Sequence, residues 1–384
     1  MTDPSPNPPS RQTSLWLPEA AIIAGIGSVI IFYTLGGGWL SDLSNHLKVA
    51  SIFVWLFGVM LCLAFRAVHH AEGLAERLGE PLGTIILTLA VICIEVALVA
   101  TVTLTGGGTP TLARDTMFAV VMVVLTGMVG LNLLVGGLKH HEQQYDLRGA
   151  NAYLSVLVPL AVMSLILPRF TPSAPGGDVS TLTGAFLAIT SAGLYLVFLL
   201  MQTGSHKSYF REPPMQDQPL DRAAVIAPHV HHANLPTAGH FVLLVAALLP
   251  IVLLSKKLAV LVDFGVAKLG APPALGGLIV AILVLTPEGM AAFKSTMVNQ
   301  LQRTINLLFG AALSTIGLTI PAVLVIRFLT GRRFELGLEP TQCVLLALTL
   351  IVCMIHFGGR RTTVLHGAVH LVLFVAYLIL MFDR

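Results

Sequence analysis

Residues 83–95 read GTIILTLAVICIE, and residues 276–288 read GGLIVAILVLTPE. Each stretch is mainly apolar and carries no charge before its last residue, a glutamate, and each has a glycine twelve positions before that glutamate. An ionisable side chain in a long apolar run is costly at membrane depth and indicates a functional site. The two carboxylates, Glu95 and Glu288, therefore predict a transporter whose site lies where two internal repeats meet.

The composition indicates a protein that resides in a lipid bilayer. Of the 384 residues, 55% are hydrophobic and 11% are charged, whereas soluble domains carry about 25% charged residues. The formal net charge is +3 and the basic residues are spread over many loops, which argues against a nucleic-acid surface. The first apolar run is too long for a cleavable signal peptide. We expect an all-α, polytopic membrane protein whose partners are the bilayer and transported ions.

The apolar runs predict about eleven transmembrane helices, because a helix needs roughly 18–25 apolar residues to cross the hydrocarbon core. The seventh run contains Ser255-Lys256-Lys257, which is an alternative end for that span. The predicted spans are 17–37, 47–68, 81–104, 113–137, 151–168, 180–202, 238–262, 273–293, 304–329, 340–357 and 363–381.

The predicted spans fall into one leading helix and two sets of five. An odd number of spans in each set turns the second set upside down relative to the first, as in the inverted repeats of many secondary transporters. Residues 112–116 (LARDT) and 301–305 (LQRTI) also match, although their offset differs by four residues from that of the glutamate stretches. The expected parts are a disordered N-terminal tail (1–16), a leading helix and loop (17–45), a first repeat (46–202), a His- and Pro-rich polar loop (203–237) and a second repeat (238–384).

The orientation of the chain follows from its basic residues. With the N-terminus in the cytoplasm, slightly more than half of the 22 Lys and Arg residues fall on the cytoplasmic side. The positive-inside rule therefore favours a cytoplasmic N-terminus by a small margin.

Several oxygen-bearing side chains accompany the two glutamates. Thr84, Thr88 and Glu95 are spaced by four and seven positions, so they share one helix face, and hard cations such as Ca²⁺ or Na⁺ prefer oxygen ligands. Pro287 lacks an N–H, so a backbone carbonyl near Leu283 loses its partner and becomes a further candidate ligand. Ser295 and Asn299 continue the Glu288 face towards the end of that helix, where they are candidates for an access path.

The ninth predicted span carries a stripe of small and polar residues. Within it Ser314 and Thr315 are candidate ligands, and Asn132 is a counterpart in the fourth span. Small residues also let helices approach closely, and membrane hydroxyls often bond to their own helix backbone, so packing is an alternative explanation. The stripe consists of Asn306, Gly310, Ser314, Gly317 and Pro321.

The two glutamates have a structural alternative, in which each is protonated or paired with a basic residue and only packs. No Lys or Arg lies within several turns of Glu95, and the nearest to Glu288 is Lys294. Burial without a basic partner favours the neutral carboxyl group, whereas a bound cation favours the carboxylate. A proton and a cation then compete for one site, and this competition is the physical basis of antiport.

The remaining polar residues point to no resident metal, cofactor or enzyme chemistry. His366 and His370 are four positions apart but lack a third ligand, so a metal site is not favoured. His229, His231 and His232 crowd the polar loop, where they are either a solvated cluster or a pH or metal sensor. The sequence has no phosphate-binding glycine loop and no nucleophile elbow. Four cysteines without paired spacing predict buried free thiols: Cys62, Cys93, Cys343 and Cys353.

These segments resemble the cation/proton exchangers of the calcium:cation antiporter superfamily, most closely the bacterial calcium (sodium or potassium):proton antiporters. The segments that carry the resemblance are Gly83 to Gly106, Pro110 to Gly137, residues 286–289 (TPEG), and residues 299–321 from Asn299 to Pro321. The resemblance implies that Glu95 and Glu288 bind the cation and protons alternately, while the repeats rock between inward- and outward-open forms. It also implies a bacterial inner membrane and Ca²⁺, Na⁺ or K⁺ exchanged for H⁺.

The chain departs from the wider superfamily in ways that bear on ion choice. The superfamily has Gly-Asn-Ala before the acid, whereas this chain has residues 92–94 (ICI) and 285–287 (LTP). Fewer amide ligands leave room for Na⁺ or K⁺ beside Ca²⁺. Two rival functions are a cation channel, which usually uses symmetric rings of ligands, and an intramembrane enzyme, which here lacks a nucleophile or metal set. The oligomeric state stays open.

Overall fold

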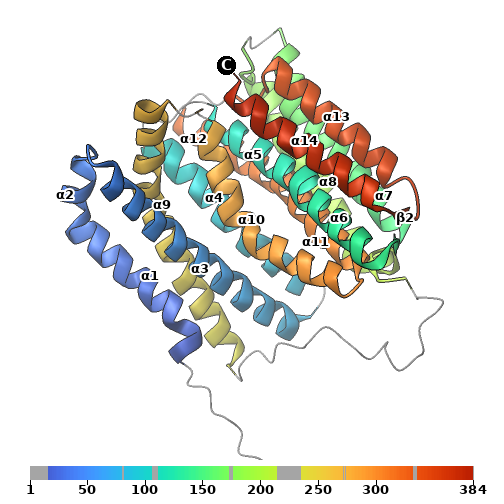
Figure 1. Cartoon of the computed structure of the whole chain (residues 1–384), viewed down its shortest axis with the longest axis horizontal. Helices are drawn as coiled ribbons and strands as arrows, with labels where there is room; N and C mark the ends of the chain where they lie inside the picture. The colour runs from blue at the N-terminus through green and yellow to red at the C-terminus, as the bar shows by residue number, and fades with distance from the viewer. Residues whose placement is uncertain are drawn as a thin grey trace, which may run out of the picture.

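The computed structural model describes residues 16–79, 82–105, 111–172, 176–213, 235–270, 272, 274–331 and 335–383. These residues form a helical bundle with one short antiparallel ribbon, in which β1 (Gln143–Gln144) pairs with β2 (Arg361–Thr362) (Figure 1). The predicted tail, apart from Trp16, lies outside the described residues, as do the three histidines of the polar loop.

Each predicted span corresponds to a helix or a run of joined helical segments. By length and composition, eight helices can cross a membrane, and three shorter apolar helices bring the total to eleven among the described residues. The expected all-α fold with about eleven transmembrane helices is confirmed, although the short α2 (Gly36–Ser41) and the β1–β2 ribbon were not expected.

The first half of the bundle begins with the leading helix and continues with five spans. Its first three helices are α1 (Trp16–Thr34), α3 (His46–Leu78) and α4 (Leu82–Thr105). The next span consists of α5 (Leu112–Met122), the π-helical η1 (Val123–Met128) and α6 (Val129–His140). The last two spans are α7 (Leu147–Ala161), which continues into η2 (Val162–Ile166) and η3 (Leu167–Phe170), and α8 (Thr181–Leu200), which continues into η4 (Met201–Ser205) and η5 (Lys207–Phe210). The second half is α9 (Thr237–Leu269), α10 (Ala274–Met297), then α11 (Leu301–Ser314) joined through the π-helical η7 (Thr315–Thr319) to α12 (Ile320–Thr330), α13 (Pro340–His356) and α14 (Val364–Phe382).

The two halves match over the first three of their five spans. The helices α3 and α9 each have 33 residues, and α4 and α10 each have 24. In both halves the next span is interrupted by a π-helical segment, η1 or η7. In Figure 1 the chain runs along α3 and α9 in opposite directions, and likewise along α4 and α10. The arrangement agrees with the inverted repeat that the sequence predicts.

Local sequence sets the ends of the long helices. The side chain of Asn45 accepts hydrogen bonds from the backbone N–H groups of Leu47 and Lys48 and so caps the start of α3. The residues that follow α3, α9 and α12 are glycines with φ near +65°, a backbone conformation that other residues rarely adopt. These residues are Gly79, Gly270 and Gly331.

The two lysines of the seventh predicted span do not end its helix. The helix α9 continues through Ser255-Lys256-Lys257 to Leu269. The ammonium group of Lys257 lies 4.7 Å from the centre of the Tyr33 ring on α1, where the ring face attracts the cation. Long lysine side chains can thus remain within an apolar helix near a membrane surface, and the alternative end at 255–257 was wrong.

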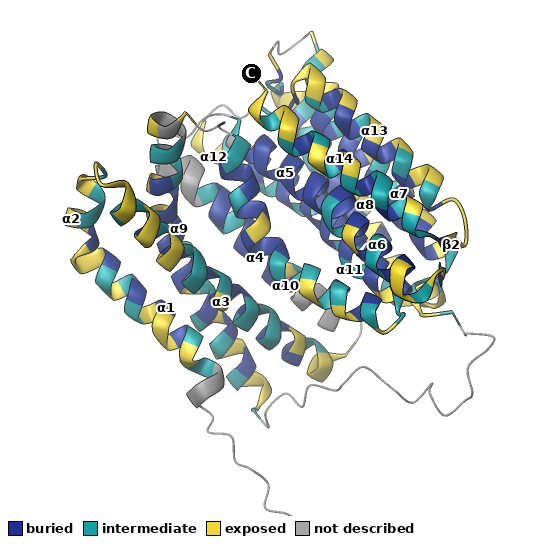
Figure 2. Cartoon of the chain, in the orientation of Figure 1, coloured by how far each residue is buried: buried dark blue, intermediate teal, exposed yellow. Residues whose placement is uncertain are grey.

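The helices pack around two hydrophobic clusters. One cluster is built on α1, α3 and α9, and the other surrounds the two spans that contain η1 and η7. These two spans are the most buried of the transmembrane helices, and Figure 2 shows buried residues along α5 at the centre and exposed residues along α1 and α14 at the edge. Most side chains on the central spans therefore contact protein, and the exposed ones lie mainly on α6 and α12.

Candidate functional site

Glu95 lies at the middle of α4 and contacts the other repeat. Its side chain is 1% exposed, and its Oε2 atom accepts a hydrogen bond of 2.9 Å from the hydroxyl of Thr315. Thr315 is the first residue of η7, so this bond joins the first repeat to the second. Thr319, one turn further along η7, also lies close to the Glu95 carboxyl group. The structure thus brings Glu95 and Thr315, two predicted site residues, into direct contact.

Glu288 lies on α10, which continues through Pro287 to Met297. Its side chain is partly buried, and the two glutamates are close enough for their charges to interact. Glu95 Oε1 and Glu288 Oε2 are both buried without a hydrogen-bond partner within the described part of the chain. Lys294 is exposed, and no ion pair to either glutamate is formed among the described residues. The arrangement leaves free carboxylate oxygens for a cation or a proton.

Each glutamate helix packs against the π-helical segment of the opposite repeat. The segment η7 lies against α4, and η1 lies against α10. Gly289 makes the second contact possible, because a Cβ atom there would lie 2.8 Å from Cε of Met128 in η1. A π-helical segment in a transmembrane helix often marks a functional site, since it breaks the regular backbone ladder. Here the two segments flank the two carboxylates.

The segment η1 carries a buried threonine that the sequence reasoning missed. Thr126 is fully buried, and its hydroxyl donates to the carbonyl of Met122 in its own helix. It occupies the segment that corresponds to the one holding Thr315. The internal repeat itself was the signal that could have identified it, once Thr315 had been chosen.

Tyr195 is a second residue that the sequence did not single out. It lies on α8, is buried, contacts the side chain of Thr88, and is close to the charge of Glu288. Gly317 of η7 makes room for it, because a Cβ atom at that position would lie 2.9 Å from Cβ of Tyr195. Thr88 therefore contacts Tyr195, which lies close to Glu288. Only the packing of α8 on η7 reveals this contact, and no spacing in the sequence predicts it.

Other predicted residues lie further along the bundle or bond to their own helices. The hydroxyls of Ser314 and Ser295 donate to the carbonyls of Ala311 and Ala291, both at 3.0 Å. Asn132 donates to the carbonyl of Met128 and accepts a bond of 2.7 Å from Thr296, two turns beyond Glu288 on α10. The side chain of Thr84 lies outside the described residues.

Asn299 lies beyond the end of α10 rather than on its face. Its φ of 62° places it in a tight turn before α11, and its side-chain oxygen accepts a bond of 2.9 Å from Gln143. This bond ties the turn to β1. The turn lies at the same end of α10 as the pair formed by Asn132 and Thr296.

The predicted histidine pair lies at the contact between α13 and α14. His356 stacks on His366 with 4.4 Å between ring centres and meets the ring of His370 at 5.1 Å. Among the described residues, no group of three His, Cys, Asp or Glu side chains is arranged to hold a metal ion. All four cysteines are free thiols, but only Cys343 and Cys353 are buried. Cys62 and Cys93 face outward from the bundle, so their predicted burial was wrong.

Comparisons with known proteins agree with this architecture. The chain matches the family described as "Sodium/calcium exchanger protein" over residues 48–204 and 239–382. It is 38% identical to the sodium-potassium/proton antiporter ChaA of Escherichia coli (strain K12), over 97% of this chain and 96% of that protein. Its fold resembles the structure of native YfkE, with a TM-score of 0.72, 16% identity and coverage of 96% and 100% of the two chains. It also resembles the H⁺/Ca²⁺ exchanger CAX, with a TM-score of 0.63, 13% identity and coverage of 95% and 88%.

Proposed function

The chain belongs to the sodium/calcium exchanger protein family, whose members are secondary transporters and not enzymes, and on that premise we propose that it exchanges Ca²⁺ for protons by alternating access. The proposed membrane is the bacterial inner membrane, with the N-terminus in the cytoplasm. Glu95 and Glu288 are the shared site for the cation and the protons. The observation that carries the proposal is the approach of these two carboxylates, one from each repeat, inside the bundle.

The proposal follows from the electrostatics of the pair. Two carboxylates without a basic partner are costly to keep charged inside a low-dielectric core. A divalent cation between them neutralises both charges, and two protons do the same. The empty state with two negative charges is the least favourable of the three, so loading with either ion precedes the conformational change. Obligatory exchange then follows from the cost of moving an unloaded site.

The ligands that complete the site are hydroxyl groups rather than amides. The Thr315 hydroxyl donates to Glu95, and the lone pairs of the same hydroxyl oxygen remain able to bind a cation. Tyr195 and Thr88 offer two further hydroxyl groups beside Glu288. Ca²⁺ takes six to eight oxygen ligands in a flexible geometry, so the remaining positions are filled by backbone carbonyls or water.

A second candidate function is Na⁺ or K⁺ exchange for protons at the same site. The observation that favours it is the 38% identity to a protein named as a sodium-potassium/proton antiporter. One monovalent cation and one retained proton together carry the same charge as one Ca²⁺, so they also neutralise two carboxylates. The charge count therefore fits both ions.

The test is proton flux in inside-out membrane vesicles that have an acidic interior. Ca²⁺, Na⁺, K⁺ and Mg²⁺ are added one at a time, and the loss of the pH gradient is followed with a fluorescent dye. A response to micromolar Ca²⁺ supports the first proposal, and a response to millimolar Na⁺ or K⁺ alone supports the second. If none of the four cations dissipates the pH gradient, both proposals are contradicted and the channel and enzyme alternatives are favoured.

The roles of the glutamates are tested in the same vesicles. Glu95→Gln and Glu288→Gln should each abolish exchange. The neutral amide of glutamine neither binds a proton nor neutralises the charge of a bound cation. The control is Glu142→Gln, since Glu142 is exposed and pairs with Arg361 on the surface. Near-normal exchange in either glutamate variant, at matched protein levels, overturns the shared-site mechanism.

A further inference from the structure

A short segment that follows α8 lies on the start of α11. It comprises residues 206–212 and contains η5, and we call it the strap. The six spans from α1 to α8 precede it, and an even number of spans returns the chain to the side of the membrane on which α1 begins. In the proposed orientation the strap therefore lies at the cytoplasmic end of the bundle.

The strap is held by an aromatic side chain and by its backbone. The ring of Phe210 packs edge-on against Tyr153 on α7, with 5.5 Å between ring centres. The Phe210 carbonyl accepts a hydrogen bond of 2.6 Å from the side chain of Asn306 on α11. Gly149 leaves room for the strap, because a Cβ atom there would lie 2.3 Å from the Tyr209 carbonyl oxygen. The strap thus joins α7 of the first repeat to α11 of the second.

Glu212, at the end of the strap, caps α11. This helix has no acidic residue in its first turn, and its N-cap residue Gln300 makes no side-chain bond to the helix backbone. The two carboxyl oxygens of Glu212 instead accept from the backbone N–H groups of Gln302 and Arg303, both at 3.4 Å. The first N–H groups of a helix need an acceptor from outside the helix, and here a residue about ninety positions earlier in the chain supplies it.

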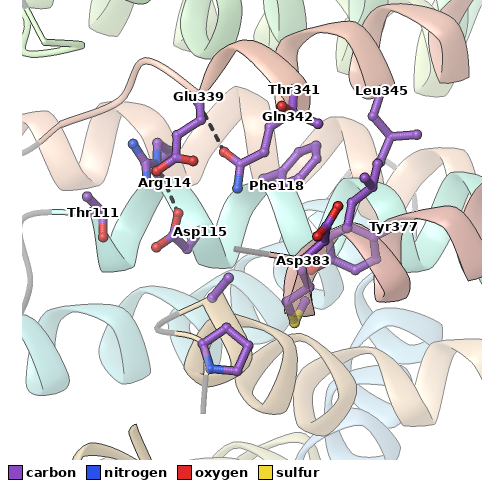
Figure 3. A pocket seen from close by; sticks show the side chains of 14 residues that line it. Thr111, Arg114, Asp115, Phe118, Glu339, Thr341, Gln342, Leu345, Tyr377 and Asp383 are labelled. Carbon is purple, nitrogen blue, oxygen red and sulfur yellow. Dashed lines mark hydrogen bonds and ion pairs between the residues drawn. The ribbon is translucent and has the colours of Figure 1, made fainter. Parts of the chain in front are cut away.

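The matching helix of the first repeat has its own acidic residue. The segment 112–116 (LARDT) places Asp115 in the first turn of α5, whereas the matching position in 301–305 (LQRTI) is Thr304. Figure 3 shows Asp115 beside Arg114 in a cavity at the opposite end of the bundle, and the Nε atom of Arg114 lies 2.9 Å from Oδ1 of Asp115. The strap thus supplies to α11 the acidic group that the sequence of α5 itself contains.

The position of the Glu212 carboxyl group makes it sensitive to pH near neutrality. The residue as a whole is exposed, but its carboxyl group lies against α11, and this loss of solvation raises its pKa to about 7. The two long hydrogen bonds and the charge of Arg303 oppose this shift without cancelling it. The charged or titratable side chains on the elements that meet here are Arg303 on α11, Asp146, Arg148 and Tyr153 at α7, and His206, Lys207, Tyr209 and Arg211 in the strap.

The direction of the pKa shift fixes the direction of the pH effect. A carboxyl group whose pKa is higher in the docked strap than in the released strap binds protons better when docked, so protonation favours docking. This stabilisation is fully present below the ordinary value of 4.5 and is lost as the pH rises through about 7. Between about pH 6 and about pH 8 the docking equilibrium should change by about tenfold.

The strap is placed to affect the transport site through α11. This helix continues into η7, where Thr315 donates to Glu95. Alternating access requires the repeats to move relative to one another. Motion of α11 relative to α7 has to break the contacts that Phe210 and Glu212 make with α11.

We propose that the strap is a pH-sensitive brake, in which protonation of Glu212 docks residues 206–212 on α7 and α11 and ionisation of Glu212 releases them. The docked strap joins the two repeats at the cytoplasmic end and slows their rocking. An exchanger that imports protons acidifies the cytoplasm, and docking of the strap in acid then limits further import. The effect on transport rate rests on the proposed function, whereas the pH-dependent docking does not.

Docking is tested on the purified full-length protein by hydrogen–deuterium exchange of the backbone N–H groups of Gln302 and Arg303. All variants are compared at one pH, about pH 8, so that the intrinsic pH dependence of exchange cancels. Glu212→Gln should slow this exchange severalfold relative to the unchanged protein, because the neutral amide resembles the protonated acid. Phe210→Ala should speed it, because the ring that packs against Tyr153 is lost. Glu142→Gln, an exposed acid that pairs with Arg361, is the matched control and should leave it unchanged.

The brake is tested by initial flux in inside-out vesicles, whose outer face is the cytoplasmic one in the proposed orientation. The cation is saturating and the pH difference across the membrane is held constant while the outer pH varies. Glu212→Gln should be slower than the unchanged protein, and the ratio of the two rates should grow by up to about tenfold between about pH 6 and about pH 8. Phe210→Ala should be faster than the unchanged protein at about pH 6, where the strap docks more firmly.

The two measurements fail in different ways. If Glu212→Gln leaves the exchange of Gln302 and Arg303 as it is in Glu142→Gln, or speeds it, the docking switch is wrong. If docking responds but the flux ratio stays constant between the two pH values, the strap is not a brake. Absence of flux with every cation overturns the proposed function and the brake together, and the exchange measurement then still decides the docking switch.

Discussion

The bond between Thr315 and Glu95 gives the sharpest test of the proposed transport site. The substitution Thr315→Val removes a hydroxyl group and keeps the β-branched shape, so the packing of η7 on α4 is preserved. The bond is 2.9 Å long, and the Glu95 side chain is 1% exposed, so water cannot replace the lost donor without opening the core. The substitution therefore isolates the effect of one donor and one ligand oxygen on the site.

The expected size of the effect follows from the charge on the acceptor. A hydrogen bond to a charged group contributes about 1.5–3 kcal/mol. We take the lower end, because a cation at the site supplies part of the lost stabilisation. An energy of about 1.5 kcal/mol corresponds to a roughly tenfold higher cation concentration for half-maximal exchange. The maximal rate should change less, because both carboxylates remain.

The assay is the vesicle flux measurement with graded cation concentrations. Thr315→Ser restores the hydroxyl and should bring the half-maximal concentration back towards that of the unchanged protein. Ser155→Ala is a matched control, because the Ser155 hydroxyl is exposed and donates to Ala152 in its own helix. If Thr315→Val binds and exchanges cations like the unchanged protein, the reasoning that links η7 to the site is refuted.

Three further substitutions test the architecture around the site. Tyr195→Phe should raise the half-maximal cation concentration severalfold in the flux assay, because it removes the hydroxyl that contacts Thr88 near Glu288; an unchanged value would place Tyr195 outside the site. Gly277→Ala should destabilise the protein by about 1–3 kcal/mol, because its Cβ atom would lie 2.7 Å from the backbone of Asp115 and Thr116. Gly27→Ala, where a Cβ atom meets open space, is its control in thermal unfolding. Asp146→Ala should cost about 1 kcal/mol as a lost helix cap, since Asp146 caps α7 by accepting from the backbone of Arg148. The hydrogen bond from the Arg148 side chain holds the pKa of Asp146 below its ordinary value of 3.8, so its contribution is present above that value and is lost as the pH falls through the lowered pKa. Thermal unfolding between neutral and acidic pH should therefore show a smaller acid-induced loss in the variant than in the unchanged protein.

Much of the fold could be predicted from the sequence because a bilayer leaves few choices. The backbone must satisfy its own hydrogen bonds at membrane depth, so long apolar runs become helices and their number follows from their length. The failures were local. The lysines at 256 and 257 did not end α9, because Lys257 reaches the Tyr33 ring. Asn299 left the helix face because the chain turns sharply before α11.

The candidate site was harder to predict from the sequence, because the residues around the two glutamates are brought there by the packing of separate helices. Glu95 and Glu288 stand out as lone carboxylates, but their neighbours are set by which helices meet. Tyr195 joins Thr88 only because α8 packs against η7. Asn132 is drawn instead to Thr296 on the far part of α10. The periodicity of an α-helix determines on which face of the helix a side chain lies. Tertiary packing determines which residues that face contacts.

The two repeats have similar backbones but different side-chain contacts. This difference is relevant to the proposed transport mechanism. Thr315 in η7 donates to Glu95 across the repeats, whereas Thr126 in η1 donates to the Met122 carbonyl of its own helix. The two glutamates also differ in exposure, since Glu95 is buried and Glu288 is partly buried. A structure with exact twofold equivalence would expose both acids equally to the two sides of the membrane. The proposed alternating access requires that only one side of the membrane be open at a time, so the two repeats are expected to differ in their side-chain contacts in any single state.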